Sequence, residues 1–261
     1  MCLQGQDTLV TILRMLGTKL CIAEEPSLVQ SLIGVLATLI RIDSSAFITI
    51  LAGFQDKDLS LQAIMEKWIE RHIEIRTPYD IKRSIVGLAT ILTCSNPAID
   101  QVIVKGCRTD TSSSIRTRSK AMTLKEEWSM VPLRSKIALL LLDSYIEADT
   151  QGLENAEDEE EWIEDDDEED DYIEGDEDDY HSYSMYGEFL GDDDDDIDFL
   201  LADIDYLERA RRENDQLTHM SVLQYIPSIL KGFQACPELF RQFCDMCTPV
   251  QTQYLQRVLQ S

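Results

Sequence analysis

The chain has 261 residues, of which 44% are hydrophobic, and a formal net charge of −27. This length allows one or two domains, and the lack of a run of about 18 apolar residues argues against a transmembrane helix. The first residues show no basic stretch followed by an apolar one, so we expect no secretory signal. Seven cysteines at scattered spacings favour buried, reduced thiols over a disulfide framework.

The first half of the sequence predicts one helix after another. Its apolar residues recur at steps of three and four, the period of an amphipathic helix. Six of the seven prolines stand at the start of such a run, where the missing N–H costs nothing. The predicted helices span Asp7 to about Cys21, Pro26 to Ile40, Ser44 or Ser45 to Ala52, Leu59 to Ile73, Thr77 to Leu92, and Asn96–Pro97 to about Gly106.

Residues 107–130 interrupt this pattern and predict a polar loop. It is the most basic stretch of the chain, with Arg108, Arg116, Arg118, Lys120 and Lys125. The cluster of Arg116, Arg118 and Lys120 suggests either an exposed polar loop or transient pairing, in the protein without a partner, with the acidic segment at residues 154–198. Nucleic-acid binding is disfavoured, because a chain at −27 repels phosphate.

Helical patterning returns at Pro132, fades by Asp149 and resumes weakly over residues 199–214. Three short helices are predicted after that. Pro227 lies inside the first of them, from Val222 to Phe233, and should kink or split it. The last opens at Thr248 with a capping box to Gln251.

Helix starts recur about every 15 to 19 residues, so two helices make a pair of roughly 40 residues, as in HEAT repeats. No alternating strand or hairpin signal stands out. The predicted fold class is therefore all-α, a HEAT-repeat-like, armadillo-like α-solenoid with a long disordered acidic insertion. The predicted organisation is residues 1–149 as helical repeats, 150–198 as the insertion and 199–261 as C-terminal helices completing the solenoid.

Residues 154–198 contain 26 of the 50 acidic residues and no Lys or Arg. The rest of the chain has 24 acidic and 23 basic residues, a net charge of −1. Mutual repulsion predicts that this segment is disordered and extended, with an end-to-end reach of about 35–40 Å. That reach matches the width of a small basic domain. A solubilising segment without a partner is the simpler alternative.

Aromatic residues occur along the acidic segment and just beyond it. They are not expected in a segment that only increases solubility. They are Trp162, Tyr172, Tyr180, Tyr183, Tyr186, Phe189 and Phe199. Carboxylates attract an Arg/Lys-rich surface, and aromatic rings stack on guanidinium groups. The candidate residues for binding a basic partner are Glu159, Glu160, Glu161, Trp162, Asp165, Asp166, Asp167, Glu168, Glu169, Asp170, Asp171, Tyr172, Asp176, Asp178, Asp179, Tyr180, Tyr186, Asp192, Asp193, Asp194, Asp195 and Asp196.

Other candidate sites are weaker. Asp192–Asp196 lack the glycine that an EF-hand loop requires, so we expect no dedicated metal site. Cys244 and Cys247 have the CxxC spacing but share an apolar helix face with Phe240 and Phe243, which favours core packing over zinc or redox chemistry. His72 shares a stripe with Trp68 and is predicted to be a core or boundary residue. No nucleotide-binding or hydrolase motif is present, so we expect neither an enzyme nor a cofactor.

Four stretches resemble the C-terminal end of karyopherin-β (importin-β family) nuclear import receptors, most closely the importin-9 subfamily. They are Leu61–His72, Ile85–Cys94, Val104–Gly106 through Arg108–Asp110, and Arg257–Gln260. The internal acidic run fits that family too.

The resemblance implies a receptor that shuttles between cytoplasm and nucleus. Such a receptor binds basic cargo, such as core histones or ribosomal proteins. It also meets Ran-GTP, here through regions mostly outside this chain, and needs neither direct nucleic-acid nor membrane binding. The resemblance further implies that the chain is one part of a longer receptor. The alternative interpretation is a helical scaffold whose acidic loop is autoinhibitory or solubilising.

Overall fold

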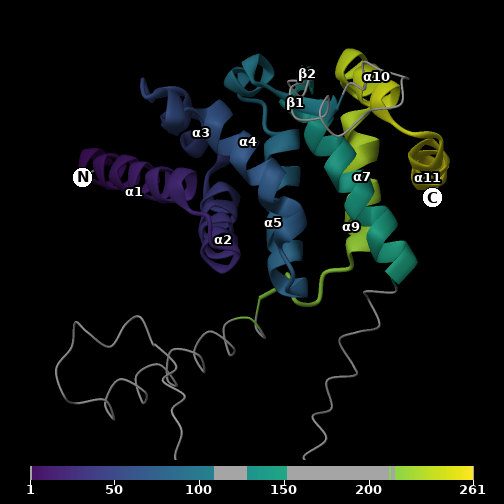
Figure 1. Ribbon diagram of the computed structural model, residues 1–261, viewed down its shortest axis with the longest axis horizontal. Coiled ribbons are helices and arrows are strands. Elements are labelled where there is room, and N and C mark those ends of the chain that lie inside the picture. The colour runs from purple at the N-terminus through teal and green to yellow at the C-terminus, as the bar shows by residue number, and fades with distance from the viewer. Residues whose placement is uncertain (1, 109–127, 152–211, 213–214, 261) are drawn as a thin grey trace, which may run out of the picture. The chain divides into compact units, whose positions relative to one another are not determined.

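The computed structural model describes residues 2–108, 128–151, 212 and 215–260 (Figure 1). The chain divides into two units, Met1–Glu154 with His219–Ser261, and Asn155–Thr218. In the second unit the described residues include a turn. There the Leu217 amide donates to Asp215 Oδ1 at 3.1 Å, and the Thr218 hydroxyl donates to the Arg212 carbonyl. The helices and strands that follow belong to the first unit.

The N-terminal half is helical, as predicted. Its elements are α1 (Cys2–Ile22), α2 (Pro26–Ile42), α3 (Ser44–Ala52), the 3-10 turn η1 (Lys57–Leu59), α4 (Leu61–Arg71), η2 (His72–Glu74), α5 (Pro78–Thr93) and η3 (Pro97–Gln101). Side-chain caps fix several starts. Ser60 accepts from the Ala63 amide and Thr77 from the Asp80 amide, which satisfies donors that a helix N-terminus leaves unpaired.

Some details of the prediction are wrong. Asp7 does not start a helix, because α1 begins at Cys2. The cap of α3 is Asp43, whose carboxylate accepts from the Ala46 amide, and not Ser44 or Ser45. The three- and four-residue apolar spacing also predicts that Leu28 and Ile73 lie on buried helix faces. Both are exposed, Leu28 at 46% and Ile73 at 83%. Ile73 turns outward because α4 ends at Arg71 and the following turn is 3-10, which changes the residue period.

The helix predicted from Asn96 to Gly106 is also wrong. Only the 3-10 turn forms, and the chain continues as strand β1 (Ile103–Arg108), which pairs antiparallel with β2 (Trp128–Pro132). Val104 lies opposite Val131 in this hairpin. β-Branched residues favour strands over helices. Of the predicted polar loop, residues 109–127 lie outside the described part of the chain.

The C-terminal helices form as predicted. They are α7 (Leu133–Gln151), α9 (Val222–Phe233), α10 (Pro237–Met246) and α11 (Pro249–Gln260). Pro227 does not split α9, since the helix runs through it. The capping box before α11 is confirmed: the Thr248 amide donates to Gln251 Oε1 at 2.8 Å, and the Gln251 amide donates to Thr248 Oγ1 at 3.3 Å. The helix expected over residues 199–214 lies outside the described residues, apart from Arg212.

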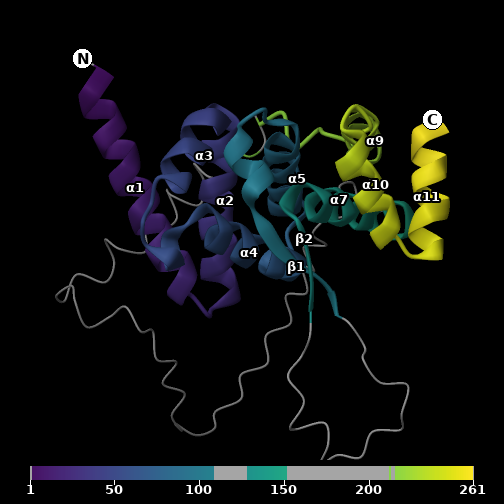
Figure 2. The same cartoon turned by 90° about the horizontal axis from the view of Figure 1, so that it is seen from above.

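The helices stack in chain order as an α-solenoid. α2 packs against α5, α5 against α7, and α7 against α9, α10 and α11, while α4 lies against α1 and β1. In both views α1 and α11 lie at opposite ends of the first unit (Figures 1 and 2). One apolar core runs through these helices and buries Trp68, Phe47 and Phe243 completely.

No single helix among the described residues has the length and apolar composition to cross a membrane. Helices α2 and α3 reach the required length and apolar composition only when they are counted as one segment, and the chain bends by 116° between them.

The packing of α2 against α5 leaves no room for a side chain at Gly87. A Cβ at this position would stand 2.9 Å from the Ala37 Cβ and 3.0 Å from the Trp68 ring. Because Ala37 and Trp68 are completely buried, we expect Gly87→Ala to lower the free energy of unfolding by about 1–3 kcal/mol. Urea unfolding of the purified chain measures this.

Gly232 in α9 is the matched control. A Cβ there would meet no atom within 4 Å, so Gly232→Ala should be neutral or stabilise the chain by up to about 1 kcal/mol through helix propensity. Equal effects of the two substitutions would contradict the close α2–α5 packing.

Candidate functional site

All of the sequence-predicted binding residues, from Glu159 to Asp196, lie outside the described part of the chain, as do Arg116, Arg118 and Lys120. The structure does describe the helices on either side. α7 ends at Gln151 and α9 begins at Val222. Glu147 and Ala148 of α7 line a small cavity together with Val222 of α9. The C-terminal part of α7 and the start of α9 therefore lie next to each other.

The C-terminal half of α7 is held by α11. The rings of Tyr145 and Tyr254 pack edge to face with centroids 6.5 Å apart, and Arg257 lies over the Tyr254 ring at 4.9 Å. Arg257 Nη1 also approaches Asp149 Oδ2 at 3.4 Å, and the Gln251 side chain donates to Asp143. These contacts hold the C-terminal half of α7, the helix that precedes the acidic segment in the sequence, against α11.

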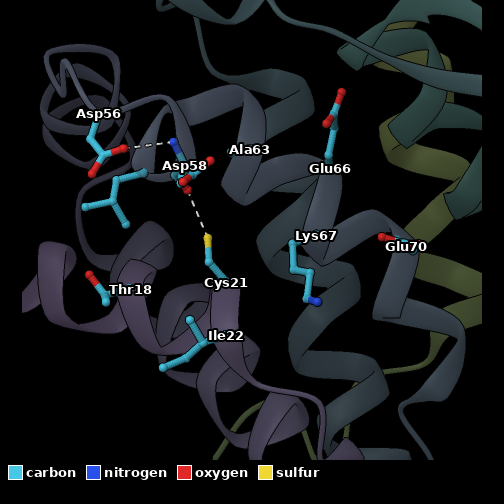
Figure 3. Close-up of a pocket in the computed structure, with 10 residues that line it drawn as sticks. Thr18, Cys21, Ile22, Asp56, Asp58, Ala63, Glu66, Lys67 and Glu70 are labelled. Carbon is cyan, nitrogen blue, oxygen red and sulfur yellow. Dashed lines mark hydrogen bonds between the residues drawn. The ribbon is translucent and has the colours of Figure 1, made fainter.

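The described residues contain an acidic cavity of about 490 Å³ between the end of α1, η1 and α4 (Figure 3). The carboxylates that line it are Asp56, Asp58, Glu66 and Glu70, with Lys67 as the single cationic side chain. Among the described residues, no Lys or Arg forms an ion pair with any of these four carboxylates. Carboxylates therefore outnumber cationic side chains four to one in the lining of this cavity, and an excess of negative charge attracts ammonium or guanidinium groups.

The wall of this cavity is fixed by local hydrogen bonds. The Asp58 amide donates to Asp56 Oδ1 at 3.1 Å, and Cys21 Sγ donates to the Asp58 carbonyl at 2.9 Å (Figure 3). Burial raises the pKa of the Cys21 thiol, and Asp58 raises it further. Cys21 therefore remains a neutral donor that joins α1 to η1.

Sequence reasoning missed this cavity. Its residues come from three separate segments, and each carboxylate alone has the pattern of a solvated surface residue. The one local signal is the i, i+4 spacing of Glu66 and Glu70, which places two like charges on one face of α4.

Cys244 and Cys247 are partly buried and pack against the core near Phe240 and Phe243, which confirms the core interpretation. Burial raises the pKa of Cys247 to about 12, and the neighbouring Cys244 adds to the shift. The thiolate, which metal binding and redox chemistry need, is thus disfavoured. The described residues contain no group of three potential metal ligands.

His72 is a core residue, as predicted, with 7% of its surface exposed. Trp68 Nε1 donates to Ser84 Oγ at 2.8 Å, and His72 Nδ1 lies 2.8 Å from the same oxygen. Trp can only donate, so the Ser84 proton is free for His72 Nδ1, which acts as the acceptor. His72 Nε2 then faces Ser144 Oγ on α7 at 3.5 Å. The neutral imidazole of His72, at the end of α4, thus connects Ser84 of α5 with Ser144 of α7.

This arrangement predicts a loss of stability in mild acid. Burial lowers the pKa of His72 to about 4, whereas an unfolded chain protonates its histidine near 6.5. Between these values the unfolded state binds more protons, so stability falls as pH drops from about 6.5 to 4 and no further below that. At pH 5 the loss should be about 2 kcal/mol.

The measurement is urea unfolding of the wild type and His72→Gln at several pH values. The comparison cancels the titration of the many carboxylates, which both chains share. The stability advantage of the wild type should shrink as pH falls through this range, and a constant difference would show that the pKa of His72 is the same in the folded and unfolded chains.

Comparison with known proteins supplies the remaining evidence. No protein-family model matches the chain. The chain is similar to importin subunit beta-5 of Schizosaccharomyces pombe, with 30% identity over 131 residues, which is 49% of this chain and 13% of the relative. It thus spans only a small part of that relative. The similarity does not single out importin-9, but together with the α-solenoid it supports a relationship to the karyopherin-β family of nuclear transport receptors.

Proposed function

We propose that this chain is the cargo-binding part of a nuclear import receptor. Its cargo would be basic proteins such as core histones or ribosomal proteins, and the closest type of receptor would be importin-9. The observation that carries the proposal is the charge partition: residues 154–198 hold 26 acidic residues, while the rest of the chain is near neutral. Similarity to an importin subunit and the α-solenoid fold support the transport role.

In this proposal the acidic segment covers the positive surface of the cargo. Its carboxylates attract Lys and Arg over a range of about 8 Å at physiological salt, and its aromatic side chains, such as Trp162 and Tyr172, stack on guanidinium groups. The segment is covalently linked to α7 on one side and, through residues 199–221, to α9 on the other. Its carboxylates and the solenoid therefore meet one cargo molecule as parts of the same chain. Ran-GTP would act through parts of the receptor mostly outside this chain, and the receptor would shuttle between cytoplasm and nucleus.

The direct test is binding of the intact chain to a fluorescently labelled, purified core-histone pair, measured by anisotropy at about 0.15 M salt. We expect saturable binding, and no binding of an acidic protein of similar size. A histone pair that binds no better than the acidic protein would contradict the proposed function.

A further inference from the structure

Exposed apolar side chains gather at one end of the first unit. Of the eleven large apolar side chains that the described residues leave exposed, six are on α1 and α2, and one, Val250, is on α11 at the opposite end (Figures 1 and 2). The end repeats of a solenoid normally turn a polar face to water. The six are 41–76% exposed and comprise Ile12, Met15, Ile22, Leu28, Val35 and Ile42.

The three exposed apolar side chains of α2 form one row, called here the α2 seam. Leu28, Val35 and Ile42 follow one another at intervals of seven residues, which places them on one face of the helix, as at one core position of a coiled coil. Ser31 and Thr38 stand three residues after the first two, at the second core position of the same pattern. Because both side chains are small, another helix can approach this face closely.

The polar groups on this face of α2 do not need water. The Ser31 hydroxyl donates to the Ser27 carbonyl at 3.0 Å, and the Thr38 hydroxyl donates to the Gly34 carbonyl at 2.9 Å. Hydroxyl groups that bond within their own helix can be buried without leaving a donor unpaired. Arg41 is the single charged residue among the 17 of α2. Covering the α2 seam therefore desolvates apolar side chains and satisfied hydroxyls.

The α2 seam is symmetric about Val35. Leu28 and Ile42 each lie seven residues from it, so two antiparallel copies of α2, related by a two-fold axis at Val35, place Leu28 of each copy against Ile42 of the other. The ends of α2 differ in charge, with Glu25 at the N-cap and Arg41 in the last turn. Antiparallel pairing brings these unlike charges near each other, whereas parallel pairing would bring like charges together.

The exposed apolar area at this end is in the range that a dimer needs. Over the six side chains it is roughly 600 Å² per chain, and a specific interface takes at least about 500 Å² from each partner. Repulsion between two chains at −27 opposes pairing, but physiological salt screens exposed charges beyond about 8 Å. Added salt should therefore strengthen the contact.

We propose that the α2 seam binds a second copy of this chain, and that the two copies form a symmetric dimer with their α2 helices antiparallel. The exposed side chains of α1 extend the interface beside the seam, since α1 packs against α2. This inference does not rest on the proposed function, because it requires no basic partner. The two also respond oppositely to salt, which weakens histone binding and strengthens the dimer.

The test is sedimentation velocity of the full chain from about 1 to 100 µM, where we expect a monomer–dimer equilibrium with a dissociation constant of about 10 µM. Raising the salt concentration from about 0.15 to 0.5 M should shift it toward the dimer. Val35→Asp places two like charges at the two-fold axis and should weaken dimerisation at least about tenfold. Val35 is 43% exposed, so this variant should fold. A wild-type chain that stays monomeric throughout would overturn the proposal and assign the face to another segment or partner.

A charge exchange tests the antiparallel register. Leu28→Glu and Ile42→Lys should each weaken dimerisation about fivefold, because each sets a charge against an apolar side chain. The double variant places opposite charges across the seam at both of its ends, so it should dimerise more tightly than either single variant. In a parallel dimer the same double variant would bring like charges together. A double variant weaker than both single ones would therefore contradict the register.

Val250→Asp on α11 is the matched control. It makes the same change as Val35→Asp at a side chain that is 58% exposed, and it alters the net charge equally. This variant should sediment like the wild type. If it weakens dimerisation as much as Val35→Asp, the added charge alone is responsible and the α2 seam is not the interface.

Discussion

Arg134→Ala is expected to lower the free energy of unfolding by about 2–6 kcal/mol, because it leaves two backbone carbonyls without a partner. The Arg134 side chain is buried at the start of α7. Its Nη1 donates to the Leu92 carbonyl at 2.5 Å and its Nη2 to the Cys94 carbonyl at 2.6 Å, while Nε pairs with Asp100 Oδ1 at 2.6 Å. It thereby satisfies the carbonyls that the end of α5 leaves unpaired, and each of these, once orphaned, costs about 1–3 kcal/mol.

Urea unfolding of the purified chain measures this effect. Arg134→Lys should recover only part of the loss, because an ammonium group cannot reproduce the planar fork that reaches three acceptors. Arg241→Ala on α10 is the control: Arg241 is exposed, and its loss should change stability by less than about 0.5 kcal/mol. If Arg134→Ala and Arg241→Ala have the same effect, Arg134 does not hold α5, η3 and α7 together.

The second large effect is expected in binding. Replacing residues 154–198 with a Gly/Ser linker of equal length removes 26 carboxylates and keeps both attachment points. If about five surface ion pairs of about 0.5 kcal/mol each form with a core-histone pair, the affinity should fall about 60- to 70-fold. Anisotropy titration at about 0.15 M salt measures the loss.

A second variant separates charge from aromatic contact. It keeps every acidic residue and changes Trp162, Tyr172 and Tyr180 to Ser. If aromatic rings stack on guanidinium groups, this variant should lose about fivefold to tenfold in affinity at unchanged charge. Affinity equal to the wild type would leave charge as the only contribution of the segment.

Most helices could be predicted because their signals are local. Pro26, Pro78, Pro237 and Pro249 stand in the first turns of α2, α5, α10 and α11, and a periodic apolar stripe follows each. The acidic segment was equally visible, since charge composition needs no fold. These features depend on residues within one or two helical turns of each other.

The hairpin could not be predicted in this way. β1 is short, and its partner β2 lies about 20 residues later in the sequence. The pairing also depends on Gly106, where a Cβ would come within 2.8 Å of the Val131 side chain, a constraint that only the paired structure reveals. The acidic cavity was missed for the same reason, because α1, η1 and α4 meet only in the fold.

The measurement that tests the central claim most directly is the salt dependence of core-histone binding, with and without residues 154–198. If the acidic segment supplies the attraction, the affinity of the intact chain falls steeply as salt rises, because salt screens exposed charges. The linker-replaced chain binds more weakly and responds much less to salt. Equal affinity and equal salt dependence in the two chains would contradict the account. Tighter binding after replacement would instead identify the segment as autoinhibitory.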